Sequence, residues 1–270
     1  MKPADGSRDL ALAAAIVIGL SRFVNGPLVW AIGALLLAGV MLAALQLIGD
    51  ADPAGATAGI PIESVMAPGL AAVAGVGALR LVPIGLLLVP ALVLAAWFIR
   101  LVLSTETRIA RATAPPSSSD RTAILVQGLI AAFGAFVGIA ILVMGALPDA
   151  TATDTPPATL GDLALLAVAD GTVAFLLGYR IAALRSTNMR DVVWAASTAA
   201  GVVAIAAAIF RSIQIPSLLG PALLIIVLFL WDAIHGSAPV RRDDPRRIWE
   251  AVLLLVLGLI VVGWTLGLRA

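Results

Sequence analysis

The most regular feature of this 270-residue sequence is a series of long apolar runs separated by short polar segments. Seven runs of about 16 to 27 residues contain no charged side chain. A helix of roughly 20 such residues, rising 1.5 Å per residue, crosses a hydrocarbon core about 30 Å thick. Seven segments reach this length, and we place the predicted membrane-spanning helices near residues 28–49, 83–104, 123–148, 160–184, 192–213, 217–235 and 248–268. These segments are not identical with the uncharged runs, because 160–184 contains charged residues and the uncharged run Ser64–Leu79 belongs to a shorter segment.

Two shorter apolar segments, Leu10–Phe23 and Ile62–Leu81, decide the number of spans. The first offers about 21 Å of helix, and the second is interrupted by Pro68. If both are interfacial or re-entrant, the bundle has seven spans; if both cross, it has nine. The charge pattern favours seven, whereas the tight turns after Arg22 and Arg80 favour nine. The predicted fold class is an all-α polytopic transmembrane helix bundle of about seven spans plus these two segments, with nine spans as the alternative.

Arginine is concentrated in alternate polar segments, 104–122, 180–190 and 236–247. The segment 149–159 contains no basic residue, and Arg211 is the only one in the next segment of that side. Because cytoplasmic loops carry the excess of Lys and Arg, the three basic segments are predicted to be cytoplasmic. This orientation places the N-terminus in the cytoplasm and the C-terminus outside a bacterial-type cytoplasmic membrane.

The composition agrees with a membrane protein. Hydrophobic residues make up 61% of the chain and charged residues 12%, and the mean hydropathy is +1.08. The polar interruptions are too short to bury a core of their own, so residues 1–270 are predicted to form a single integral membrane domain. Asp5 and Asp9 precede the first apolar segment and disfavour a cleaved signal peptide, so we expect that segment to be retained.

Several kinds of chemistry lack the residues they need. The chain has no cysteine, which excludes disulfides, Fe–S clusters and thiolate metal sites. His235 is the sole histidine, and Lys2 precedes every apolar run, so bis-histidine haem and a buried Schiff base are excluded too. The signatures of zinc proteases, serine hydrolases and P-loops do not occur. The sequence therefore predicts no enzyme activity, no cofactor and no metal.

Asp170 is the one acidic residue deep inside a predicted span. It lies about ten residues, or roughly 15 Å, into the 160–184 segment. A carboxylate at that depth costs roughly 2.5–3.5 kcal/mol on insertion scales, so it is expected to face other helices or water. It is either a proton- or cation-coupling carboxylate or a protonated acid bonded to a neighbouring helix through Ser197 or Thr198. We favour the structural alternative, because a relay normally uses several polar groups.

Arginines at the ends of apolar segments are the candidates for contact with lipid headgroups. The alternative for each is a simple anchor whose side chain reaches toward the interface. The net charge of +1 gives no indication of nucleic-acid binding, so the expected partners are membrane lipids and other membrane proteins. The candidate lipid contacts are Arg22, Arg80, Arg241, Arg242, Arg246 and Arg247.

Three further patterns carry weaker hypotheses. Asp232 and His235 are three residues apart and could form an acid–base or metal pair, although interfacial placement is the simpler interpretation. Gly134-x-x-x-Gly138 predicts close packing between helices of the same chain. The run Ala195–Ala208 is small on every face, which predicts a central position in the bundle.

Three function classes remain. The leading hypothesis is a non-catalytic accessory or scaffold subunit, and the alternative is a small transporter or channel that uses Asp170. The third is a membrane-embedded transferase for lipid-linked substrates, which would use the acids Asp50, Asp52 and Glu63. A polar path at Asp170 would favour the transporter, and acids and bases converging at one interface would favour the enzyme.

Overall fold

The computed structural model describes residues 3–49, 62–112, 116–144, 159–186, 188–213, 215 and 218–235. Every regular element among these residues is an α-helix, which confirms the all-α class for the described part of the chain. The helices are α1 (Pro3–Ser21), α2 (Pro27–Gly49), α3 (Glu63–Arg80), α4 (Leu88–Ala110), α5 (Ser118–Met144), α6 (Leu160–Ala183), α7 (Met189–Ser212) and α8 (Leu219–His235).

Most helices lie where the apolar runs place them. Helices α2 and α6 begin and end within a residue of the prediction. Local chemistry explains two of the starts: Pro27 opens α2, where its missing N–H costs nothing, and Thr159 with Asp162 forms a capping box at α6. Helix α4 differs most, because it starts after the turn that contains Pro83 and continues through polar residues to Ala110. The predicted seventh span, 248–268, lies outside the described residues.

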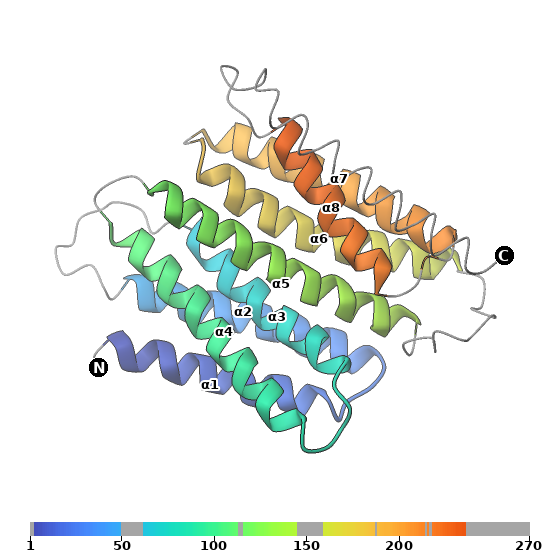
Figure 1. Cartoon of the computed structure of the whole chain (residues 1–270), viewed down its shortest axis with the longest axis horizontal. Coiled ribbons are helices and arrows are strands. Elements are labelled where there is room, and N and C mark those ends of the chain that lie inside the picture. The colour runs from blue at the N-terminus through green and yellow to red at the C-terminus, as the bar shows by residue number, and fades with distance from the viewer. Residues whose placement is uncertain are drawn as a thin grey trace.

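The two short segments form full helices. Helix α1 has 19 residues and α3 has 18, which corresponds to about 27–28 Å each. Helix α3 continues through Pro68, which costs it one backbone hydrogen bond near its start. Both helices run alongside their longer neighbours in the bundle (Figure 1).

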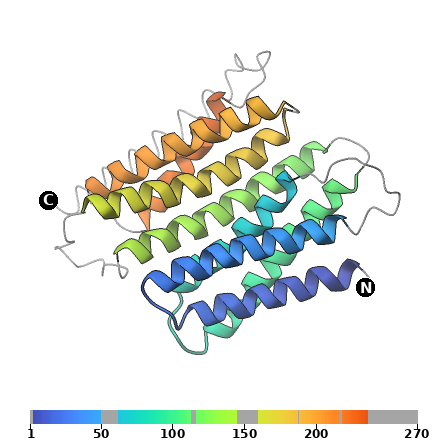
Figure 2. The same cartoon turned by 180° about the vertical axis from the view of Figure 1, so that it is seen from behind.

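The eight helices lie side by side, and each runs antiparallel to the helix before it (Figures 1 and 2). We call the end at which α1 begins and α4 ends the basic end, and the opposite end the far end. Helix α3 is central, packed against α1, α2, α4, α5 and α6. Among the described helices, α7 packs mainly against α6 and α8, so within the described part of the bundle it does not have the central position predicted from Ala195–Ala208.

Small residues let α3 approach α5 closely. A Cβ added to Gly77 would collide with the carbonyl oxygen of Gly134 and with the backbone of Gly138. The Cβ of Ala74 would likewise lie 3.1 Å from a Cβ added at Gly134. The Gly134-x-x-x-Gly138 pattern therefore serves packing inside the chain, as predicted.

The outer surface of the bundle is apolar. Exposed side chains include Leu35 (73% exposed), Leu86 (95%) and Trp194 (72%). Among the described helices, α2, α4, α5, α6 and α7 are long and apolar enough to cross a membrane. A surface of this kind fits hydrocarbon as its solvent, which supports a membrane location.

Candidate functional site

Helix α6 carries two of the charged side chains that are buried in the bundle. Its buried face follows the sequence Asp170, Val173, Ala174, Leu177 and Arg180. These positions recur at intervals of three and four residues, so they share one side of the helix. The apolar members separate the two charges by ten residues, or about 15 Å along the axis. Asp170 and Arg180 therefore belong to two different polar sites.

Asp170 is 2% exposed, and its Oδ1 atom has no hydrogen-bond partner. It borders a cavity of about 30 Å³ between α5, α6, α7 and α8. A space of that size holds one or two water molecules. Apart from Asp170 itself, the one charged residue in the lining is Arg211 of α7, and most of the other lining residues are apolar, such as Phe136, Leu166 and Phe210.

The expected contact of Asp170 with Ser197 or Thr198 is wrong. The Thr198 hydroxyl donates to the carbonyl oxygens of Trp194 and Ala195 in its own helix. The antiparallel α6–α7 hairpin explains the difference, because Gly171 lies against Ala200 and Ala204. The level of Asp170 on α7 is therefore several residues beyond Thr198, toward the far end.

Toward the basic end, Arg180 of α6 forms an ion pair with Glu106 of α4. The Arg180 side chain is 3% exposed and the Glu106 side chain 1%. Nε of Arg180 donates to Oε1 of Glu106 at 2.8 Å, and Nη2 donates to Oε2 at 2.5 Å. The geometry is bidentate, which is the strongest form of this contact. The buried Ser64 hydroxyl of α3 lies beside the same carboxylate.

The sequence interpretation missed this pair because it assigned Glu106 to a polar loop and used Arg180 only as a marker of topology. A usable signal was present. Ile99, Val102, Leu103 and Glu106 follow one another at helical spacing and are all buried. Extending the apolar stripe of α4 by one turn would have placed Glu106 on the core side. A neighbouring contact, from Gln127 Nε2 to Thr105 Oγ1 at 3.2 Å, ties α5 to the same turn.

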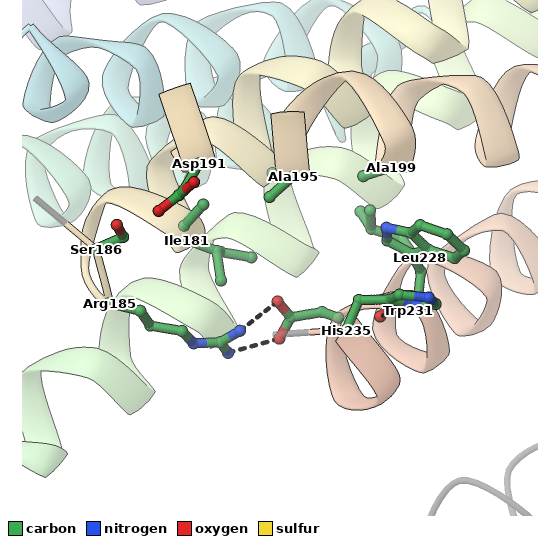
Figure 3. Close-up of a pocket in the computed structure, with 12 residues that line it drawn as sticks. Ile181, Arg185, Ser186, Asp191, Ala195, Ala199, Leu228, Trp231 and His235 are labelled. Carbon is green, nitrogen blue, oxygen red and sulfur yellow. Dashed lines mark hydrogen bonds and ion pairs between the residues drawn. The ribbon is translucent and has the colours of Figure 1, made fainter. Parts of the chain in front are cut away.

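A third polar site lies at the basic end between α6, α7 and α8, around a cavity of about 190 Å³ (Figure 3). Arg185 donates from Nη1 and Nη2 to the two carboxylate oxygens of Asp232, at 2.6 Å each. The His235 ring stacks on Trp231, with ring centroids 3.6 Å apart. Both oxygens of Asp232 thus bind Arg185, and in the described residues no hydrogen bond or ion pair joins Asp232 to His235. The described residues also contain no group of three or more His, Asp and Glu suited to a metal.

Arg22 and Arg80 lie together at the far end, where the turns after α1 and α3 meet. Nη2 of Arg80 donates to the carbonyl oxygens of Ser21 at 2.8 Å and Val24 at 2.7 Å, and so caps the end of α1. Nη1 of Arg80 donates to Asn25 at 3.2 Å. Nη2 of Arg22 donates to the carbonyl oxygen of Val82, in the turn after α3, at 3.3 Å. The two guanidinium groups are close enough to repel each other.

The remaining candidate residues from the sequence lie partly outside the described residues and partly at the basic end. Arg241, Arg242, Arg246 and Arg247 lie outside the described residues, as do Asp50 and Asp52. Glu63 opens α3 at the basic end. Lipid contact by the arginines stays a prediction. Comparison of the chain with protein-family models, with curated proteins and with solved structures finds no match.

Proposed function

We propose that this protein is a non-catalytic integral membrane subunit of the accessory or scaffold type. The observation that carries the proposal is the ion pair that two charged side chains form inside the bundle. Glu106 and Arg180 bind each other through two hydrogen bonds and are almost completely buried. Such a pair holds α4 and α6 together, and neither residue lines the cavity beside Asp170 or the one beside Asp232.

The hydroxyl groups support the same interpretation. Thr105, Thr107 and Thr172 each donate to the carbonyl oxygen four residues earlier in the same helix. These hydroxyls are thus satisfied within their own helices, which is how a polar group is kept at low cost in an apolar environment. The arrangement favours a rigid body over a channel.

Photo-crosslinking in native membranes tests the scaffold role. A photoreactive amino acid is placed singly at Leu35 of α2, Val93 of α4 and Ile205 of α7, whose side chains are 73%, 62% and 63% exposed. A scaffold presents one of these faces to a protein partner, so one position should give a discrete protein adduct. The other two serve as controls and should give lipid adducts. Lipid adducts alone at all three positions would contradict the proposal.

A second candidate, a proton- or cation-coupled transporter, is favoured by Asp170 alone. Its unpartnered Oδ1 and the cavity beside it leave room for water or a small ion. Proton and cation flux into liposomes should be compared between the wild type and Asp170→Asn, which keeps the shape and a hydrogen-bonding group. The scaffold proposal expects no flux from either protein. Flux that only the variant loses would replace the scaffold with the transporter.

We also propose that the bundle has nine spans, with the N-terminus in the cytoplasm and the C-terminus outside. The proposal counts all eight described helices and adds residues 248–268. Its support is the full length of α1 and α3 and the distribution of charge. The half of the described bundle nearer the basic end carries Arg8, Arg100, Arg108, Arg111, Arg121, Arg180, Arg185 and Arg190, whereas the far half carries Arg22, Arg80 and Arg211.

A further inference from the structure

An apolar groove of about 290 Å³ lies between α2, α3, α5 and α6, in the half of the bundle nearer the far end. Along α2 it extends from Val29 to Leu37, which corresponds to about 12 Å of helix. That is most of the roughly 15 Å thickness of one hydrocarbon leaflet. The lining is apolar except for Trp30 and Thr172, and the Thr172 hydroxyl already donates to a carbonyl of its own helix.

Small residues form part of the lining. Gly33 of α2, Gly77 of α3 and Gly138 of α5 all line the groove, so it reaches down to the helix backbones. Gly33 faces open space, because a Cβ added there meets no atom within 4 Å. The groove is therefore a real recess with room for a narrow apolar chain.

The Arg22–Arg80 pair lies beyond the far-end mouth of this groove, and neither arginine lines it. Val73, Val76, Gly77 and Arg80 follow at intervals of three and four residues on α3, and the first three line the groove. Arg80 continues the same stripe one turn farther, about 6 Å along the axis. Its partner Asn25 lies four residues before Val29, which lines the groove from α2.

The charge at this mouth has no acidic residue near it in the first four helices, whose acids Asp5, Asp9, Glu63 and Glu106 lie near the basic end. No Asp or Glu occurs in residues 10–49 or 64–105 of the sequence. The Nε atoms of both Arg22 and Arg80 are buried without an acceptor. Two guanidinium groups that repel each other are stabilised by an anion between them, and a phosphate is the anion whose geometry fits arginine best.

We propose that this site binds an anionic phospholipid, with its phosphate between Arg22 and Arg80 and one acyl chain in the groove. The positive charge lies at one end of the apolar groove, just as the charged headgroup of a lipid lies at one end of its acyl chain. Neutral lipid offers no net negative charge, so the site selects phosphatidylglycerol over phosphatidylcholine. The inference concerns a binding site and does not rest on the scaffold role.

Native mass spectrometry of the purified full-length protein, titrated with each of these two lipids, tests the proposal. Phosphatidylglycerol should bind about tenfold more tightly than phosphatidylcholine. Arg22→Gln should remove that preference, because it deletes one charge and only one long hydrogen bond of the turn. Arg111→Gln is the matched control, since Arg111 ends α4 at the opposite end of the bundle.

A second pair of variants tests the groove itself. Gly33→Leu fills the recess and should weaken binding of both lipids about tenfold. Gly39→Leu is the control on the same helix: a Cβ there also meets no atom within 4 Å, and the residue does not line the groove. Both variants should melt like the wild type, which separates loss of lipid from loss of fold.

Four outcomes would overturn the proposal. Equal binding of the two lipids would indicate unspecific annular lipid. Binding that Gly33→Leu leaves unchanged would show that no acyl chain enters the groove. Competition by glycerol 3-phosphate at the same concentration as lipid would assign the arginines to a soluble anion. A lipid-free dimer that Gly33→Leu dissociates would assign the groove to a second copy of the chain.

Discussion

Glu106 and Arg180 show how much depends on a single partner inside this bundle. Each side chain is almost completely buried, and each supplies the charge that the other needs. A buried ion pair gains little over an apolar pair of the same volume, whereas one of its charges left alone is costly. The two residues should therefore be tolerant of joint replacement and intolerant of single replacement.

Arg180→Met should lower the free energy of unfolding by about 3–5 kcal/mol, because it leaves the Glu106 carboxyl buried without its partner. Adding Glu106→Leu to the same chain should recover most of that loss. Thermal unfolding in detergent measures both. Arg185→Met is the control: Arg185 and Asp232 are 35% and 22% exposed, and losing such a pair should cost about 1 kcal/mol or less. Equal melting of Arg180→Met and the wild type would contradict a stabilising role for the pair.

At this scale the sequence predicted the burial of Asp170, but it missed the burial of Glu106 and Arg180 and the partners of all three residues. The burial of Asp170 was expected from its place about ten residues into a predicted span, and the structure gives it 2% exposure. Its neighbours depend on the register of α6 against α7, which a single apolar pattern does not specify. Arg80 is a similar case, because its carbonyl partners belong to a turn more than 50 residues away in the sequence.

Helix α3 has nearly the bounds of the predicted segment, but its place in the bundle was not predicted. Its glycines and Pro68 made it resemble a re-entrant segment, yet it is the helix that touches five others. The reason is steric: a helix without bulky side chains can be surrounded closely on all sides. Helices α2 and α6 were predictable because uniform apolar runs and local capping residues set their bounds. The late end of α4 was not, because the burial of Glu106 depends on Arg180 of another helix.

Gly77→Ala tests the close contact of α3 with α5. The added methyl group would meet the backbone of Gly134 and Gly138, which cannot move away as a flexible side chain could. The helices must separate, at a cost of about 1–3 kcal/mol. Gly39→Ala is the matched control, since its Cβ meets nothing within 4 Å and alanine favours a helix by about 1 kcal/mol.

Thermal unfolding in detergent should therefore rank the three proteins, with Gly77→Ala the least stable and Gly39→Ala at or above the wild type. A Gly77→Ala protein as stable as the wild type would mean that α3 and α5 are farther apart in the membrane than in this structure.

For the whole molecule, the decisive position is the segment between α2 and α3. Nine spans place Thr57 in the cytoplasm, whereas seven place it outside. The chain has no cysteine, so each introduced cysteine reports one site. Thr57→Cys should react with an impermeant maleimide only after the cytoplasmic face is opened.

Ser117→Cys and Ser237→Cys should behave in the same way, and Thr153→Cys should react from outside. Labelling of Thr57→Cys from outside, with the other three as stated, would restore the seven-span arrangement. Reversal of the other three would invert the orientation of the protein.

The central place of α3 has a consequence for biogenesis. It is poorly suited to enter lipid alone, since it carries Glu63 and Arg80 at its ends and is not among the five helices that are apolar enough to span unaided. A nascent chain released after α3 would leave Gly77 without the α5 backbone that it packs against. Helix α3 must therefore be inserted together with α2 or α4, and it reaches its final contacts only when α5 has been synthesised and docks against Gly77. The order of synthesis thus makes the centre of this bundle one of its later parts to be completed.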